Sequence, residues 1–265
     1  MAVLGQVATE AFPQLTITQS QTWVPPQDGT VCIHVVGAGG GGIGVTGDNV
    51  AGGGAGAYAK IPSLAVTTSG SYALVVGAGG AGNSNNNTAA TGGNSTIAGT
   101  GLTGTKTCGG GGGAASGTNG GGGSVSGSGE SWAGYSGGAG AQAGGAVGIY
   151  ATGAAGVTSP TGYGGMTDAQ SGGLAMSGYG IICGGSKPSK SLEVNTVPYG
   201  FVENASDLCG GGSFSYWNAG TDIVVRGGTG GIGGGGGGCR SRLQGPYAVA
   251  GDGGDGIILI QYLPW

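Results

Sequence analysis

The sequence predicts a mainly β protein in which a small strand framework carries long polyglycine segments, with almost no α-helix. Glycine occupies 73 of the 265 positions, far above the roughly 7% of an average protein. Apolar segments with strand character lie near both ends of the chain, and the long stretch between them has neither strand nor helix periodicity. Ordinary side-chain packing therefore cannot account for the whole fold.

The N-terminal half of the strand framework is predicted from three regions. Residues 30–36 (TVCIHVV) have a period of two that puts Val31, Ile33 and Val35 on one face. A turn at residues 23–29 leads into this strand, and residues 11–18 are a candidate extended segment. Shorter strands are predicted at residues 57–61, 64–67 and 72–76, of which we expect the last two to form a hairpin across residues 68–71.

The C-terminal half comes from apolar β signals at residues 222–226 and 256–262. The apolar blocks can bury one another only if the two halves meet. We therefore expect an antiparallel β-sandwich-like or jelly-roll-like framework that encloses or flanks a glycine-helix bundle. Residues 1–20 differ in composition from the rest and are interpreted as an attachment or assembly segment, and residues 21–265 as one glycine-rich domain.

The glycine runs fit polyglycine-II-type helices. Collagen is excluded, because glycine does not recur at every third position and the chain has only 9 prolines. The alternative is that the glycine runs are disordered, but a charged fraction of 7% and a mean hydropathy above zero are not typical of a disordered, fully solvated chain. Without Cβ atoms, extended threefold helices can lie close enough for each backbone N–H to reach a neighbouring carbonyl.

Charge and cysteine content exclude several classes of partner. The formal charge of −4 and the lack of a basic cluster argue against a nucleic-acid partner. No stretch approaches the roughly 20 apolar residues of a membrane span, so we expect no membrane insertion, and no secretory signal is recognised. The five cysteines form no C-x-x-C pair and are interpreted as reduced packing residues.

Several short motifs resemble catalytic or cofactor-binding motifs, but each lacks a residue or an element that the function requires. Residues 37–42 (GAGGGG) match a dinucleotide fingerprint, but the following residues cannot open the required helix. Lys106 lacks the adjacent glycine of a phosphate-binding loop, and His34, the sole histidine, is expected to be a packed or surface strand residue. Asp252 and Asp255 are expected in a turn before the last strand. We predict no catalytic residue, no metal and no cofactor.

Aromatic residues interrupt the central glycine-rich tract. Such residues provide large contact area at small entropic cost, so they are candidate receptor-binding residues. The alternative, that they cap the ends of glycine helices, has equal support. The candidates are Trp132, Tyr135, Tyr150, Tyr163, Tyr199, Phe201, Phe214, Tyr216 and Trp217. The preferred stretch is residues 198–218, because it combines four aromatic residues with polar neighbours.

A set of ordered blocks resembles the glycine-rich domains of bacteriophage tail-fibre tip and adhesin proteins. The blocks are residues 23–26 (WVPP), 31–42 (VCIHVVGAGGGG), 52–60 (GGGAGAYAK), 74–82 (LVVGAGGAG), 92–96 (GGNST) and 251–262 (GDGGDGIILIQY). The resemblance covers residues 21–265. It implies layers of polyglycine helices framed by strands, with loops at one end that contact a bacterial surface receptor, and it implies no catalytic residues.

The leading functional hypothesis is a virion tail-fibre tip or adhesin that recognises a glycan or outer-membrane protein on a bacterial surface. It would be made in the host cytoplasm and join other virion tail proteins through the N-terminus; fibre analogy alone suggests a homotrimer. The alternatives are a purely structural fibre or baseplate component, an ice-binding glycine-helix protein and an enzyme, which has only His34 in its favour.

Overall fold

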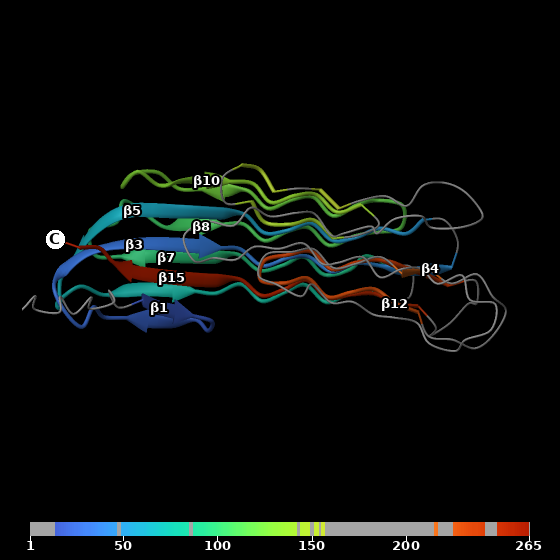
Figure 1. The fold of residues 1–265 in the computed structure, drawn as a ribbon, viewed down its shortest axis with the longest axis horizontal. Helices are drawn as coiled ribbons and strands as arrows, with labels where there is room; N and C mark the ends of the chain where they lie inside the picture. The colour runs from blue at the N-terminus through green and yellow to red at the C-terminus, as the bar shows by residue number, and fades with distance from the viewer. Residues whose placement is uncertain are drawn as a thin grey trace, which may run out of the picture.

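The structure of the protein, a computed structural model, describes residues 14–46, 49–84, 87–141, 144–148, 151–153, 155–156, 215–216, 225–241 and 248–264. Within these ranges the chain forms β-strands and no helix. The expectation of a mainly β, antiparallel fold is confirmed. Most strands gather at one end of the molecule, here called the strand end, and wavy glycine-rich segments extend from them toward the opposite, far end (Figure 1).

The first sheet joins strands from both parts of the chain. Its order is β1-β15-β3-β5-β10, antiparallel throughout. Strand β15, from the C-terminal part, therefore lies between β1 and β3 from the N-terminal part, which confirms the predicted meeting of the two halves. The strands are β1 (Gln14–Ile17), β15 (Ile257–Tyr262), β3 (Gly29–Val36), β5 (Tyr58–Val66) and β10 (Ala133–Tyr135).

Strand β5 covers both segments predicted at residues 57–61 and 64–67. The pairing of β3 with β5 shifts between Val31 and Ile33, so that two residues of β5, Pro62 and Ser63, lie opposite Cys32. Proline lacks the amide proton that a ladder needs, and within sheets it is tolerated at such bulges. The proline that divides the sequence signal therefore bends one strand and does not end it.

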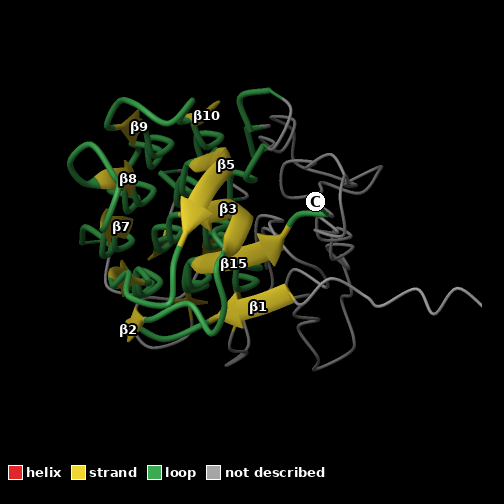
Figure 2. Cartoon of the chain, turned by 90° about the vertical axis from the view of Figure 1, so that its left-hand side faces the viewer, coloured by secondary structure: helices red, strands yellow, loops and turns green. Residues whose placement is uncertain are grey.

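The second sheet has the order β2-β6-β7-β8-β9, also antiparallel. It faces the first sheet, as the view onto the strand end shows (Figure 2). Three of its strands lie in the tract where the sequence showed no periodicity, so that prediction was wrong for this part. The strands are β2 (Gln21–Trp23), β6 (Tyr72–Val75), β7 (Ser95–Gly99), β8 (Lys106–Cys108) and β9 (Val125–Ser126).

The predicted hairpin between residues 64–67 and 72–76 does not form. Strand β5 belongs to the first sheet and β6 to the second, so the turn between them carries the chain across the core. The physical reason is burial: Leu64 and Val66 point into the core from one sheet, and Tyr72 and Leu74 from the other. Facing sheets bury both apolar sets, which a flat hairpin would not.

One apolar core lies between the two sheets. Val31, Ile33 and Val35 of β3 are fully buried in it, as their period of two predicts, together with Leu74 and Ile97 of the second sheet. Strand β1 adds Ile17 to this core and pairs with β15. Residues 14–17 thus belong to the first sheet, although they precede the boundary near residue 20 that the sequence suggests.

Each long strand of the two sheets continues directly into a glycine-rich segment (Figure 1). Beyond Val36 the segment of residues 37–44 lies inside a bundle of such segments, because every residue in it donates a backbone hydrogen bond to a neighbouring segment. From residue 37 to residue 43 the donors rotate among three segments with a period of three: Gly37, Gly40 and Ile43 donate to residues 51–57, Ala38 and Gly41 to residues 90–93, and Gly39 and Gly42 to residues 251–254. At the end of the segment Gly44 departs from this rotation and donates to Asn83.

The same segment accepts hydrogen bonds from three further segments. Carbonyl oxygens of residues 38–43 accept hydrogen bonds from the backbone amides of residues 80–83, 111–114 and 236–239. Six neighbours around one backbone form a close-packed arrangement of chains, in which hydrogen bonds replace side-chain burial. Asp252 and Asp255 lie in one of these segments and not in a turn, which corrects the prediction for them.

Glycine is required in the bundle because the backbones nearly touch. A Cβ atom added to Gly39 would lie 1.9 Å from the Gly234 oxygen, and one added to Gly40 would lie 2.1 Å from the Gly112 oxygen. Both distances are far below a van der Waals contact. The close approach, and not backbone freedom, explains these glycines.

Five short strands lie at the far end of the bundle. Two parallel sheets have the orders β11-β13-β4 and β12-β14. The predicted segment at residues 222–226 contributes its last two residues to β12. The strands are β4 (Gly44–Thr46), β11 (Ser215–Tyr216), β12 (Val225–Arg226), β13 (Cys239–Ser241) and β14 (Ala248–Val249).

We predict that Gly40→Ala lowers the free energy of unfolding by about 3 kcal/mol, because the added methyl group must displace the Gly112 carbonyl from a hydrogen-bonded position. The matched control is Gly121→Ala, where nothing lies within 4 Å of the added Cβ. Urea denaturation of both variants provides the measurement. Equal stability of the two would contradict the packing argument.

Candidate functional site

Most of the aromatic candidates fall on residues whose surroundings the structure does not give. Tyr150, Tyr163, Tyr199, Phe201, Phe214 and Trp217 lie outside the described residues. The backbone of Tyr216 is placed in β11. Trp132 and Tyr135 are described with their side chains and lie in and beside the connection from β9 to β10.

Trp132 is held by the strand end. Its side chain is half-buried, packs against the core between the two sheets, and donates its indole N–H to the Ser126 carbonyl at 3.1 Å. These are the contacts of a side chain that closes the core between the two sheets. Tyr135 differs, because it is 39% exposed on β10, an edge strand, opposite Tyr58. Its ring is accessible to a partner.

The far end holds the other placed candidate. Figure 1 shows β4 and β12 at this end, opposite the C-terminus. Tyr216 pairs with Arg240 of β13, which in turn pairs with β4. Strand β11 therefore anchors the end of the preferred stretch, residues 198–218, to the far end. The rest of that stretch lies outside the described residues.

A small apolar cluster closes the bundle where the glycine segments reach the far end. Its members are buried, and they have side chains where the interior of the bundle has glycine. They are Ile43, Val45, Val50, Ala51, Ala89 and Ala114. The far end thus has an apolar cap that supports the short strands.

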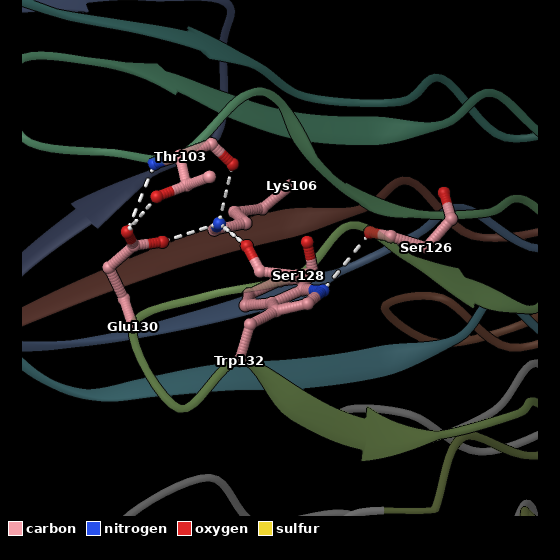
Figure 3. Close-up of polar contacts among 6 residues, drawn as sticks. All are labelled: Thr103, Lys106, Ser126, Ser128, Glu130 and Trp132. Atoms are coloured by element: carbon pink, nitrogen blue, oxygen red, sulfur yellow. Dashed lines mark hydrogen bonds and ion pairs between the residues drawn. The ribbon is translucent and has the colours of Figure 1, made fainter.

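The best-defined polar site is at the strand end, around Lys106 (Figure 3). Lys106 occupies an inward position of β8 and its side chain has no exposed surface. Its ammonium group donates to the carbonyls of Thr103, at 2.9 Å, and Ser128, and forms an ion pair with Glu130. A buried charge is costly unless it is paired and hydrogen-bonded, and here both conditions are met.

Glu130 completes this site from the connection between β9 and β10. One carboxylate oxygen accepts the backbone N–H of Thr103 at 3.0 Å and its hydroxyl at 2.8 Å, and the other pairs with Lys106. The hydrogen bond from Lys106, followed by those from Thr103, lowers the pKa of Glu130. Glu130 and Ser131 have φ angles of 48° and 54°, uncommon for residues with side chains. The contacts to Glu130 hold this conformation.

The connection that Glu130 fixes crosses from the second sheet to the first. Lys106 and Glu130 therefore tie the edges of the two sheets together at the strand end. The site has no free nucleophile or proton acceptor, since each polar group of the pair is engaged. The pair therefore has a structural role, which is to hold the two sheets together.

His34 forms a second polar group on the outer face of the first sheet. The side chain is 8% exposed, and its Nδ1 lies 2.8 Å from the Tyr58 hydroxyl, while Nε2 lies 3.4 Å from the Cys32 sulfur. Burial, and then the charge of Lys60, lowers the pKa of His34 to about 4. The prediction of a packed strand histidine is confirmed.

The Cys32–His34 contact resembles part of a nucleophilic dyad but lacks its electrostatics. Burial raises the pKa of the Cys32 thiol, and the pKa of His34 is lowered, so both groups are neutral at pH 7. A reactive cysteine needs the opposite shifts. In the described parts of the chain, no three His, Cys, Asp or Glu side chains gather as a metal site would require. Nor does any helix there have the length and hydropathy to cross a membrane.

Sequence reasoning missed the Lys106–Glu130 pair. It considered Lys106 only as part of a phosphate-binding loop and did not consider Glu130. A usable signal was the alternation in residues 105–108 (TKTC), which puts Lys106 and Cys108 on the same face of a short strand. A lysine on the apolar face of a strand requires a buried partner, and that partner lies 24 residues away in the chain.

We predict an acid-dependent loss of stability from His34. Its pKa is about 4 in the folded protein and near 6.5 when unfolded, so the unfolded chain binds more protons between these values. The free energy of unfolding therefore falls by up to about 3 kcal/mol as the pH decreases through this window. Urea denaturation between pH 7 and pH 4 measures it, with His34→Asn as the control that cannot be protonated. A parallel decline in the variant would contradict the assignment to His34.

We also predict that Glu130→Gln lowers the midpoint of thermal unfolding, because it leaves the buried ammonium of Lys106 without its counter-charge. Adding Lys106→Met should recover part of the loss, since the buried charge is then removed as well. Thr105→Ala, an exposed neighbour, is the control. Scanning calorimetry reports all three midpoints. If the double variant were less stable than Glu130→Gln, the pairing would not explain the effect.

The comparisons with known proteins concern the whole length of this fold. No relative of the chain is found among curated proteins. A family model described as a glycine-rich domain matches residues 16–263, which include both sheets, the bundle and the short strands at the far end. The matched span begins inside β1 and ends just after β15, so it coincides with the described fold. The chain belongs to the glycine-rich domain family.

Proposed function

We propose that this chain is a structural and receptor-binding protein of a virion, a tail-fibre tip or adhesin that recognises a glycan or outer-membrane protein on a bacterial surface. Membership of the glycine-rich domain family supports the glycine-rich part of this proposal. The phage context comes from the sequence resemblance alone. The observation that carries the receptor-binding role is the placement of β11, with Tyr216, at the far end of the bundle.

We infer that the glycine segments of the bundle are polyglycine II helices. The support is the rotation of hydrogen-bond donors among three neighbours with a period of three residues, which is the number of residues per turn in this helix. A chain with that period presents each successive amide to a different neighbour. The two facing sheets would then be a β-sandwich-like framework that flanks a glycine-helix bundle.

Such a bundle suits the display of a binding surface. Its segments are fixed on several sides by backbone hydrogen bonds, and its interior consists of glycine and small buried side chains that a partner cannot reach. Chemical specificity must then come from residues that join the segments, where large side chains occur. The candidates of residues 198–218 remain the preferred ones, because β11 brings their C-terminal part to the far end.

The two ends of the molecule have different roles in this proposal. Gln14 lies opposite Gln261 in the first sheet, so the first described residues and the end of β15 share the strand end. Residues 1–20 would attach the chain to other virion tail proteins there, and the far end would meet the receptor. A homotrimer, synthesis in the host cytoplasm, and the absence of a cofactor and of a nucleic-acid partner are parts of the same proposal.

We predict that the double variant Tyr216→Ala/Trp217→Ala binds receptor-bearing bacterial cells more weakly by about 2 kcal/mol or more, if these side chains are anchors. The measurement is adsorption of labelled purified protein to a panel of bacterial strains, with unlabelled protein as competitor. Circular dichroism of the variant checks that the strands remain.

Two further results separate the alternatives. Tyr135→Ala, at an exposed aromatic residue away from the far end, should leave adsorption unchanged if the far end alone binds. If the wild-type protein adsorbs to no strain yet is incorporated into particles, the purely structural role replaces the receptor-binding one.

A further inference from the structure

Two segments at the surface of the bundle donate backbone hydrogen bonds to side chains. In the segment of residues 77–83, Gly79 donates to Asp255 Oδ1 and Gly82 to Asp252 Oδ1, each at 2.7 Å. Both aspartates are exposed. The two donor glycines are three residues apart in the sequence, and so are the two acceptor aspartates. Each carboxylate therefore accepts a hydrogen bond from one glycine amide.

A second surface segment shows the same arrangement with neutral side chains. In residues 109–115, Gly110 donates to Asn94 Oδ1 at 3.0 Å and Gly113 to Thr91 Oγ1 at 3.5 Å. Thr91 and Asn94 are again three residues apart and exposed. Two unrelated pairs of side chains therefore meet two pairs of glycine amides with the same period.

The interior segment of residues 37–44 shows what these side chains replace. There each amide is taken by the carbonyl of an adjacent glycine-rich segment. At the surface the side chains of Asp252, Asp255, Thr91 and Asn94 supply the acceptor that a further segment would otherwise supply. Were they absent, two rows of amides would be open to a chain of matching period, much as the edge of a β-sheet is open to another strand.

We propose that these four side chains close the bundle against lateral addition of a glycine segment from a second copy of this chain. The occupant follows from the geometry, because a row of amides three residues apart matches a glycine segment and does not match a β-strand, whose period is two. The protein carries several such segments, so each copy would be both donor and acceptor. The closing side chains keep the bundle at its present number of segments.

The test is the double variant Asp252→Gly/Asp255→Gly, compared with wild type by sedimentation velocity at rising protein concentration. We expect the variant's sedimentation coefficient to increase with concentration above the wild-type value, whatever the wild-type subunit number. A hexaglycine peptide should bind the variant and reduce this association. Circular dichroism and hydrogen exchange of both proteins establish that the variant is folded.

The control Asp252→Asn/Asp255→Asn separates hydrogen bonding from charge. Asparagine retains an oxygen acceptor at the same position, so this variant should remain as dispersed as wild type. Association of the asparagine variant would overturn the proposal and assign the effect to charge repulsion. If the glycine variant is unfolded, the variant Thr91→Gly/Asn94→Gly exposes the amides of Gly110 and Gly113 instead, and the same sedimentation and peptide-binding measurements are made on it. A folded variant with an open row, no concentration-dependent association and no peptide binding would also overturn the proposal.

Discussion

The fold depends on hydrogen bonds between glycine-rich backbones, which at most of the glycines lie too close together for a side chain. Around residues 37–44 every amide finds a carbonyl on a neighbouring segment, and a Cβ atom at Gly39 or Gly40 would overlap that neighbour. Ordering each residue costs roughly 1–2 kcal/mol, whereas a typical hydrogen bond contributes only about 1 kcal/mol net. The bundle is therefore stable only as a cooperative unit with the apolar core of the two sheets.

The junction between strands and bundle is a change in packing. In the strand end, side chains such as Val35, Leu74 and Ile97 fill the space between two sheets. Beyond Val36 most residues are glycine or alanine, and segments that continue one sheet hydrogen-bond directly to segments that continue the other, as Ala38 does with Gly93. The chain passes from a period of two to a period of three without changing direction. This continuity makes the core and the bundle one body.

Side chains in this molecule act mainly where the repeating backbone pattern stops. The Lys106–Glu130 pair fixes the edges of the two sheets at the strand end, and the apolar cluster around Ile43 caps the bundle at the far end. The aspartates at 252 and 255 occupy an open row of amides along the side. The proposed binding role follows the same logic, since aromatic residues near β11 would act where the glycine segments end.

The sequence by itself determined that the fold combines β-strands with closely packed glycine-rich segments. The alternation in residues 30–36 was enough to predict β3, because a buried face demands a period of two, and the β-branched apolar run in residues 256–262 was enough to predict β15. The abundance of glycine was enough to predict closely packed backbones. For the candidate binding site, the sequence indicated only that aromatic residues were the candidates. It could not distinguish Trp132, whose ring closes the core, from the exposed Tyr135.

Only the tertiary structure decided how these elements combine. Strand β9 has two residues, too few for alternation to identify it, and it forms because β8 supplies its hydrogen-bond partners. The partner of each glycine amide is likewise chosen by three-dimensional proximity, since successive donors reach segments far apart in the chain. Lys106 and Glu130 meet for the same reason: a buried charge is paired across space, and the spacing of the two residues in sequence carries no trace of it.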